Sequence, residues 1–265
     1  MRGLKGKVAI VTGGATGIGR AIMERLCLEG VAVTFSGISD GGTSTEQQCM
    51  KRGYPVQFVR GDMAEEAFCK RLADAAVARW GKINYLVNNA FSFIAKGIDA
   101  TRAEWLRSMS VGPMGYATMA QYVVPAMRRE GGGAIVNLSS ISAHIAQPNR
   151  WTYNAAKGAV NQLTRCMALD LSADNIRVNT LSPGWIWTRE VDKAAGNDRS
   201  KWGPVWGKFH MLRRLGEVEE CAGPAAFLLS DDASFITAAE IMVDGGYHGM
   251  GSEGLGEVSS FAGSN

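Results

Sequence analysis

Cysteine and histidine are scarce in this 265-residue sequence, which has five cysteines and three histidines. The cysteines are scattered along the chain without a CxxC pair, at Cys27, Cys49, Cys69, Cys166 and Cys221. An odd, scattered set excludes a disulfide framework and offers no zinc-type ligand spacing. We therefore expect inert thiols, a reducing cytoplasmic environment and no metal site.

Strong charge and long apolar runs are also missing. The formal net charge is only +3 and no basic block stands out, so the electrostatic footprint of a nucleic-acid-binding protein is absent. No apolar run reaches the roughly 20 residues that span a bilayer. The N-terminal stretch lacks the apolar region and cleavage site of a signal peptide. We expect a small-molecule partner, and neither nucleic acid nor a membrane.

No Pro/Ser-rich or charge-rich linker divides the chain. We expect one domain over residues 1–247, followed by a Gly/Ser-rich tail at 248–265. Apolar strand-like runs lie at 7–12, 31–36, 56–62, 83–90, 133–140, 176–184 and 239–246. Helix-like runs lie at 17–30, 45–53, 65–81, 102–131 with an interruption near Pro113, 151–172 and 217–230.

Strand runs that are apolar throughout, with helices between them, are typical of a parallel sheet covered on both faces. Right-handed crossovers then predict an α/β fold with a single doubly wound parallel sheet flanked by helices. Ligands of such sheets bind beyond the carboxyl ends of the strands. The residues that follow each strand are therefore the candidates for chemistry.

The first strand is followed by a glycine-rich turn, TGGATGIG (12–19). Gly13 permits a tight turn, Gly17 lets the backbone approach a ligand, and Gly19 allows close contact between helix and sheet. Free N–H groups and the dipole at the helix start suit a pyrophosphate. The turn predicts dinucleotide binding, whereas the alternative is a merely flexible connection.

Six motifs in order resemble those of the short-chain dehydrogenase/reductase family over about residues 5–247. They are TGGATGIG (12–19), NNA (88–90), NLSS (137–140), YNAAK (153–157), NTLSPGWIWT (179–188) and VDGG (243–246). The resemblance implies a Rossmann-type fold, a nicotinamide cofactor and hydride transfer at a carbon that bears oxygen.

Tyr153 and Lys157 lie four positions apart on a predicted helix, so they share one face. A buried ammonium beside a phenol favours the phenolate, which would make Tyr153 a proton donor and acceptor near neutral pH. By resemblance, Lys157 also holds the nicotinamide ribose and Ser140 hydrogen-bonds the substrate oxygen. These three are the predicted catalytic residues. The alternative is a surface Tyr/Lys pair with the lysine reaching water, and a serine that only caps its strand.

The resemblance also assigns the cofactor contacts. They are Gly13, Thr16, Gly17, Ile18, Gly19, Ser36, Asp62, Met63, Asn89, Ala90, Tyr153, Lys157, Pro183, Gly184, Ile186 and Thr188. The acid that binds the adenosine ribose in NAD enzymes is replaced by Gly37, and residues 36–42 hold no arginine or lysine. The cofactor is NAD or NADP, and the missing cation favours NAD.

Two positions depart from the family pattern. Gly112, in VGPMG (111–115), stands where the family has an asparagine that holds a water of a proton relay, and Pro113 follows it. Phe91 replaces the last glycine of NNAG. Either backbone carbonyls at the Pro113 kink hold the relay water in an active enzyme, or the chain is a nucleotide-sensing protein with weakened catalysis.

The long segment 185–216 is the predicted substrate lid and has four tryptophans. The predicted substrate residues are Phe91, His144, Gln147, Arg150 and Trp185. Aromatic faces beside cations suit a cyclic or polyhydroxy alcohol such as a sugar or a sugar acid. The alternative substrate is a 3-oxoacyl thioester or another hydrophobic ketone, and the alternative role of the tryptophans is packing of the lid.

Small and large apolar residues alternate along the helix at 151–172. In the resembling family the corresponding helix forms a dimer face, usually within a tetramer, so we expect a homo-oligomer. Ordinary packing of this helix on the sheet is the alternative.

Overall fold

The computed structural model describes residues 1–255, and residues 256–265 of the predicted tail lie outside this range. Seven parallel strands form one sheet in the order β3-β2-β1-β4-β5-β6-β7. The strands are β1 (Val8–Val11), β2 (Ala32–Gly37), β3 (Val56–Arg60), β4 (Tyr85–Asn88), β5 (Gly133–Leu138), β6 (Ile176–Pro183) and β7 (Glu240–Val243). The predicted doubly wound parallel sheet is thus confirmed.

Strand β1 shows why these runs form buried strands. All four of its residues are buried, and successive side chains face opposite sides of the sheet. Ala9 and Val11 belong to one apolar core, whereas Ile10 belongs to the other. The strand order reverses between β1 and β4, which pair through Ala9 and Tyr85. The carboxyl ends of these two strands therefore flank the crevice in which doubly wound sheets bind ligands.

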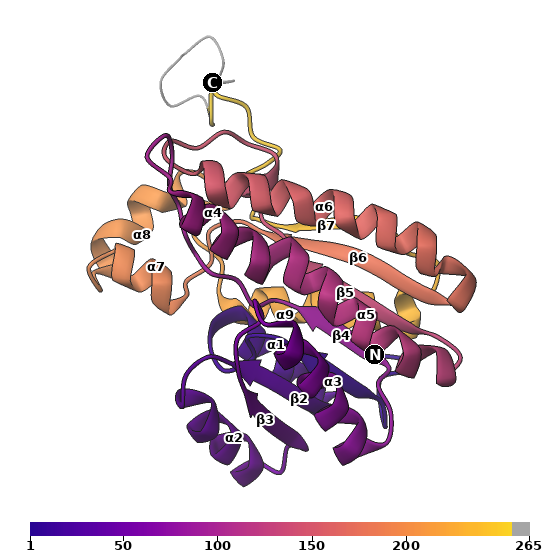
Figure 1. Cartoon of the computed structure of the whole chain (residues 1–265). Helices are drawn as coiled ribbons and strands as arrows, with labels where there is room; N and C mark the ends of the chain where they lie inside the picture. The colour runs from indigo at the N-terminus through magenta and orange to yellow at the C-terminus, as the bar shows by residue number, and fades with distance from the viewer. Residues whose placement is uncertain (256–265) are drawn as a thin grey trace.

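Helices cover both faces of the sheet (Figure 1). The helices are α1 (Gly17–Leu28), α2 (Gly41–Lys51), α3 (Glu66–Trp80), α4 (Arg102–Met109), α5 (Gly115–Arg129), α6 (Trp151–Leu171), α7 (Arg189–Ala194), α8 (Arg199–Gly207) and α9 (Val218–Leu229). Short helical turns are η1 (Ser110–Met114), η2 (Ile141–Ala143), η3 (Ser172–Asp174) and η4 (Asp231–Ala233). Residues of α1 and α9 share one apolar core, and residues of α3, α5 and α6 share the other.

The long helix expected over 102–131 is interrupted, as its sequence predicts. Helix α4 leads into the wide turn η1, and α5 continues after it. Gly112, with φ −77° and ψ −114°, leaves the helical conformation, and Pro113 follows directly. Proline cannot donate a backbone hydrogen bond and disturbs the preceding helical turn, which explains the position of the break.

The predicted lid, residues 185–216, contains two short helices that the sequence did not indicate. Figure 1 shows α7 and α8 together at the left end of the molecule, beyond the carboxyl ends of the strands. Tryptophan side chains of this segment and Leu215 form a small apolar cluster of their own. The lid therefore packs largely on itself, at the end of the sheet where ligands are expected.

Among residues 1–255, no helix is long and apolar enough to cross a membrane. Cys27, Cys49, Cys69 and Cys221 are buried, Cys166 is exposed, and all five are free. Burial raises the pKa of the Cys27 and Cys221 thiols to about 12, so they are unreactive near neutral pH.

Candidate active site

Ser140, Tyr153 and Lys157 meet beyond the carboxyl end of β5. Ser140 comes two residues after the strand and caps η2, with its Oγ accepting a hydrogen bond from Ser142 N at 3.1 Å. Tyr153 lies in the first turn of α6, within hydrogen-bond contact of Ser140. The Ser139 hydroxyl donates to the carbonyl oxygen of Lys157 at 3.0 Å, which fixes α6 to the strand end. The structure thus brings the three predicted catalytic residues together.

Lys157 is buried, with 3% of its surface exposed, so it does not reach to water. Its Nζ donates to the Leu138 carbonyl at 2.8 Å and lies 4.2 Å from the centre of the Phe91 ring. Burial lowers its pKa from 10.5 to about 7 because the ammonium loses hydration that one carbonyl and one ring do not replace. Lys157 can therefore exchange a proton near neutral pH.

The phenol of Tyr153 differs from the sequence-based expectation. Burial raises its pKa above 10, and this effect outweighs the Ser140 hydrogen bond and the positive charge of Arg150, which lower it. Lys157 Nζ lies 5.8 Å from the centre of the Tyr153 ring, and the cation that acts on the phenol is Arg150. The expectation that Lys157 lowers the pKa of Tyr153 was wrong for the protein without coenzyme. A buried lysine with a pKa near 7 carries little positive charge above that pH, so it cannot favour the phenolate there.

We expect Lys157→Met to stabilise the protein, and more so at lower pH. Between pH 7 and 10.5 the unfolded chain holds a proton that folded Lys157 has released, so wild-type stability rises with pH across this window. Below about pH 7 the full cost of burying the ammonium remains. Melting temperatures at about pH 6 and about pH 10 would measure this, with the exposed Lys51→Met as control. An equal effect of Lys157→Met on the melting temperature at both pH values would contradict the lowered pKa of Lys157.

Phe91 fills the space beside Gly112. A Cβ atom built on Gly112 would lie 2.6 Å from Phe91 Cε2, so only glycine leaves room for the ring. The same ring is edge-on to Tyr153, with centroids 5.3 Å apart, and covers Lys157 Nζ. The two departures from the family pattern are therefore one packing arrangement, in which an aromatic ring occupies the position expected for a relay asparagine.

The glycine-rich turn has the shape that a dinucleotide needs. Gly13 has φ +66°, and a Cβ there would lie 2.9 Å from Ala90 Cα. A Cβ on Gly19 would lie 2.4 Å from the Asn89 side-chain nitrogen, whereas one on Gly17 would meet open space apart from Thr188, at 3.8 Å. Thus Gly13 and Gly19 let the turn pack onto β4, and Gly17 faces outward.

The start of α1, next to this turn, suits an anion. Its first turn carries no acidic residue, and Thr16 makes no side-chain cap hydrogen bond, so the first N–H groups are free to bind a phosphate. Asn89 Nδ2 donates to the carbonyls of Thr12 at 3.0 Å and Gly13 at 3.2 Å. Ala90 N donates to Thr12 Oγ1 at 3.0 Å. Asn89 and Ala90, which follow β4, thus hold the turn in place through hydrogen bonds to Thr12 and Gly13. The free N–H groups next to the turn fit a pyrophosphate.

The residues expected beside the adenosine are partly engaged with other side chains. Ser36 Oγ accepts a hydrogen bond from Gly13 N at 3.3 Å and lies 3.9 Å from the sulfur of buried Met63, so it faces the turn. Asp62 forms an ion pair of 2.6 Å with Arg107, which sequence reasoning missed. The Arg107 hydrogen bond helps to hold the pKa of Asp62 below its usual value, against burial.

The segment after β6 forms the opposite wall of the crevice. Pro183 ends the strand, and Gly184 N donates to the Val243 carbonyl at 3.0 Å. A Cβ on Gly184 would lie 2.9 Å from Asp244 Cα, which explains the glycine. Ile186, near the start of the lid, forms a β-bridge with Gly216 at its end, so this bridge joins the two ends of the lid. Thr188 caps α7, with its hydroxyl accepting from Val191 N at 3.4 Å.

Aromatic rings lie beside Tyr153 and on the lid. Phe93 lies 4.9 Å from the Tyr153 ring, centroid to centroid. On the lid, Trp185 lies 5.1 Å from Trp206 and 5.7 Å from Phe209. Trp185 was a predicted substrate residue, whereas Phe93, beside the phenol, and Phe209, beside Trp185, were missed because no spacing in the sequence reveals these contacts.

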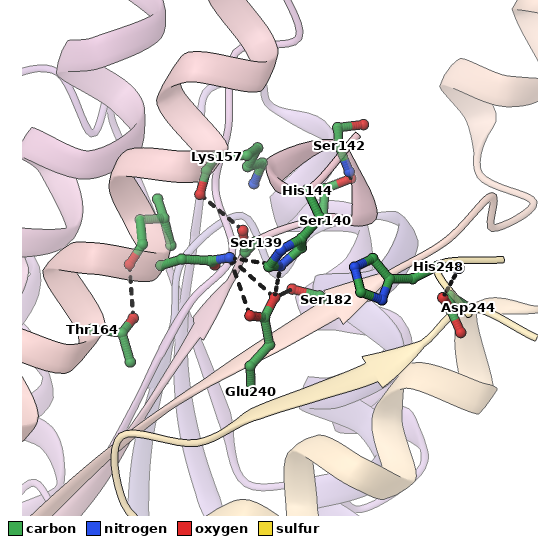
Figure 2. Close-up of polar contacts among 12 residues, drawn as sticks. Ser139, Ser140, Ser142, His144, Lys157, Thr164, Ser182, Glu240, Asp244 and His248 are labelled. Carbon is green, nitrogen blue, oxygen red and sulfur yellow. Dashed lines mark hydrogen bonds and ion pairs between the residues drawn. The ribbon is translucent and has the colours of Figure 1, made fainter. Parts of the chain in front are cut away.

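His144, a predicted substrate residue, is engaged elsewhere. Figure 2 shows its ring directed at Glu240 of β7, with His144 Nε2 2.8 Å from Glu240 Oε1. The same nitrogen lies 3.0 Å from Asn161 Nδ2, and the Ser182 hydroxyl donates to the same carboxylate. His144 therefore ties the loop after β5 to β7 and α6. Its contact with the substrate stays a prediction, and the structure adds a hydrogen-bonding partner 96 residues away in sequence that the sequence did not indicate.

Gln147 is partly engaged as well. Its Oε1 accepts a hydrogen bond from the Ser142 hydroxyl at 2.6 Å, which links Gln147 to the residue whose backbone N–H donates to Ser140 Oγ. No group of three or more potential metal-ligating side chains occurs among residues 1–255. The three candidate catalytic residues therefore offer proton transfer at Tyr153, and the glycine-rich turn offers a crevice with the shape of a dinucleotide site.

Comparisons with known proteins show which proteins this chain is similar to. A family model described as enoyl-(acyl carrier protein) reductase matches residues 13–248. The chain is 35% identical over 243 residues to the cis-4-hydroxycyclohexanecarboxylate dehydrogenase of Sinomonas cyclohexanicum, covering 91% of this chain and 96% of the relative.

Two further proteins are similar over nearly their whole length. The NADP-dependent (R)-specific alcohol dehydrogenase of Lentilactobacillus kefiri is 35% identical over 253 residues, which cover 92% of this chain and 97% of that protein. The ligand-free aldohexose dehydrogenase of Thermoplasma acidophilum superposes with a TM-score of 0.85 at 34% identity, covering 94% of this chain and 96% of that chain.

Proposed function

We propose that this chain, which belongs to the short-chain dehydrogenase/reductase family, interconverts a cyclic or polyhydroxy secondary alcohol, such as a sugar or a sugar acid, and its ketone. It is an NAD(P)-dependent enzyme that acts on CH–OH groups, so we prefer the enzyme over a nucleotide-sensing protein with weakened catalysis. The observation that carries the substrate proposal is the pair of aromatic rings Phe93 and Trp185, of which Phe93 packs on Tyr153 and both lie 5.6 Å from the Arg150 guanidinium.

A bound nicotinamide would supply hydride transfer to or from the carbinol carbon. We assign the matching proton transfer to Tyr153 Oη. In the reduction it gives its proton to the ketone oxygen, and in the oxidation it takes the alcohol proton as its own proton moves toward neutral Lys157. Ser140 Oγ hydrogen-bonds the same oxygen of the substrate. Lys157, held by the Leu138 carbonyl and titrating near neutral pH, supports proton exchange at Tyr153.

The coenzyme would lie across the crevice between β1 and β4. We assign its pyrophosphate to the first N–H groups of α1, and its nicotinamide to the space between Tyr153 and Ile186. Thr188 and Asp62 are the side chains we place beside the amide and the adenine, respectively. Each of these assignments keeps the coenzyme at the carboxyl ends of the strands, where Ser140 also lies.

For the coenzyme itself we propose NAD. The fold brings Arg60 to the end of β2, where the sequence shows no cation, since Gly37 pairs with Arg60 in register. Asp40 neutralises it through an ion pair of 2.6 Å, and the Asp40 side chain remains 83% exposed. A neutral pair with an open carboxylate suits the ribose hydroxyls of NAD better than the extra phosphate of NADP.

We expect Asp40→Asn to shift the preference toward NADP. Removal of the carboxylate frees Arg60 for the ribose phosphate, and one charge-assisted hydrogen bond is worth about tenfold in kcat/KM. The NADP-to-NAD ratio of kcat/KM measures this shift. Asp74→Asn, which breaks the exposed Lys70–Asp74 pair, is the control. A wild-type enzyme that already prefers NADP would contradict the proposal.

The substrate proposal is tested by following the absorbance of the reduced coenzyme with either nicotinamide and a panel of ring alcohols, sugars and sugar acids. We expect saturation with one of these at millimolar concentration or below. Activity only on 3-oxoacyl thioesters would overturn the proposal in favour of its alternative.

We also propose a homo-oligomer, a dimer or tetramer, that uses α6. Trp151 and Leu169 on this helix are 53% and 76% exposed, which favours a partner over packing within the chain alone. Light scattering gives the oligomeric state. For the cell we propose a cytoplasmic location, on the evidence of the free thiols.

A further inference from the structure

Arg150, the residue directly before α6, has a guanidinium without an acidic partner among residues 1–255. Its Cζ lies 5.6 Å from the ring centroid of Phe93 and 5.6 Å from that of Trp185. Aromatic faces attract the guanidinium but accept few hydrogen bonds from it. Within the described part of the chain, its fork of N–H donors therefore has no carboxylate to bind.

The charge of Arg150 reaches the candidate catalytic centre. It lowers the pKa of Tyr153 and also that of Tyr247, in both cases against burial, which raises them. Tyr247 packs 6.0 Å from Phe209 of the lid, centroid to centroid. The positive charge of Arg150 thus lies close enough to act on Tyr153 and on Tyr247, which packs on the lid.

The surroundings of Arg150 fit the body of a ring. Phe93 packs on Tyr153 at one side, and Trp185 continues into the lid rings Trp206 and Phe209 at the other. A ring between these walls would present one edge to Tyr153 and another to Arg150. Because Arg150 and Tyr153 are separate side chains, the former at the cap of α6 and the latter in its first turn, the reacting carbon and the group held by Arg150 would sit at different ring positions.

We propose that Arg150 binds a carboxylate of the substrate, and that the substrate is a ring alcohol whose carboxylate and reacting CH–OH lie at different ring positions. This inference deepens the proposed function and rests on it. The planar guanidinium binds a carboxylate with two parallel hydrogen bonds, which also orients the ring. In the oxidation, the C–H bond would yield hydride to a bound coenzyme and the O–H proton would go to Tyr153 Oη as the phenol passes its own proton toward neutral Lys157, while the carboxylate keeps its charge.

A binding experiment tests this without turnover. Cyclohexanecarboxylate and the neutral cyclohexanemethanol are titrated into the coenzyme-free protein, and tryptophan fluorescence reports occupancy beside Trp185. We expect the acid to bind at least about tenfold more tightly than the alcohol, and Arg150→Gln to weaken the acid about 10–100-fold. Arg150→Lys keeps the charge without the fork, so we expect an intermediate loss.

The control variant is Arg129→Gln, which removes the same charge from the exposed end of α5. We expect it to leave the affinity for the acid unchanged. Equal affinities for the two probes in the wild type, or equal losses in the Arg129 and Arg150 variants, would overturn the proposal.

Turnover separates this inference from the proposed function. We expect a hydroxycyclohexanecarboxylate to exceed its methyl ester about 10–100-fold in kcat/KM, mainly through KM, and Arg150→Gln to remove that preference. If acid and ester turn over equally, Arg150 binds no carboxylate and the proposed function stands. If no ring alcohol reacts with either coenzyme, the proposed function fails, and the binding titration still decides the role of Arg150.

Discussion

Replacing Tyr153 with phenylalanine is expected to lower kcat for alcohol oxidation by about 10²–10⁴-fold, the contribution of a positioned general acid–base. The change removes one oxygen atom and leaves a ring that still packs against Phe91 and Phe93. Without Oη, the alcohol proton has no acceptor as hydride leaves the carbon. The corresponding loss in transition-state stabilisation is about 3–5 kcal/mol.

This experiment has a matched control in Tyr122→Phe. The Tyr122 hydroxyl donates to Glu66 at 2.8 Å on the outer side of α5, away from the catalytic set. Initial rates give kcat, and fluorescence titration with the coenzyme gives its dissociation constant. We expect Tyr153→Phe to bind the coenzyme nearly as tightly as the wild type. Turnover close to that of Tyr122→Phe would remove Tyr153 from the mechanism.

The second large effect is expected at Gly112. An asparagine there, as in the family pattern, would place its Cβ 2.6 Å from the ring of Phe91. Overpacking of this kind costs about 1–3 kcal/mol of stability. A displaced Phe91 ring also disturbs Lys157, whose Nζ it covers, and a shift of about 1 Å at a catalytic group can cost about 10²-fold in rate. We therefore expect Gly112→Asn to lose both stability and kcat.

The double variant Gly112→Asn/Phe91→Gly separates packing from a general effect of substitution. Removal of the ring frees the space that the asparagine needs, so we expect the double variant to exceed Gly112→Asn in both kcat and melting temperature. Gly158→Ala on α6, where a Cβ meets nothing within 4 Å, is the control and should be neutral or slightly stabilising. A double variant as poor as the single one would show that Phe91 and Gly112 are not coupled.

Much of the fold could be predicted because its cause is local. Runs such as VAIV at β1 are β-branched and apolar, and they are bounded by glycines, so they identify a buried strand without any tertiary information. The break at Gly112 and Pro113 follows from the chemistry of proline. Helix α8 was not predicted because its tryptophan-rich segment with an internal proline lacks a helical apolar period, and α7 was not predicted because its six residues are too few to show one.

The site was less predictable, since its contacts join distant segments. The acceptor of Lys157 is a backbone carbonyl, at Leu138, which no residue type reveals. His144 was placed at the substrate, and the sequence did not indicate its hydrogen bond to Glu240 across the sheet. The cation that acts on Tyr153 is Arg150, although the sequence suggested Lys157, because burial lowers the pKa of the lysine.

The central claim is that Ser140 and Tyr153 act as one proton-handling unit at the substrate oxygen. The most direct test is kcat/KM for Ser140→Ala, Tyr153→Phe and the double variant on one ring alcohol. Residues that act as a unit are strongly non-additive, so we expect the double variant to lose little more than Tyr153→Phe alone. Losses that multiply, with the double variant slower by the product of the two single effects, would contradict it.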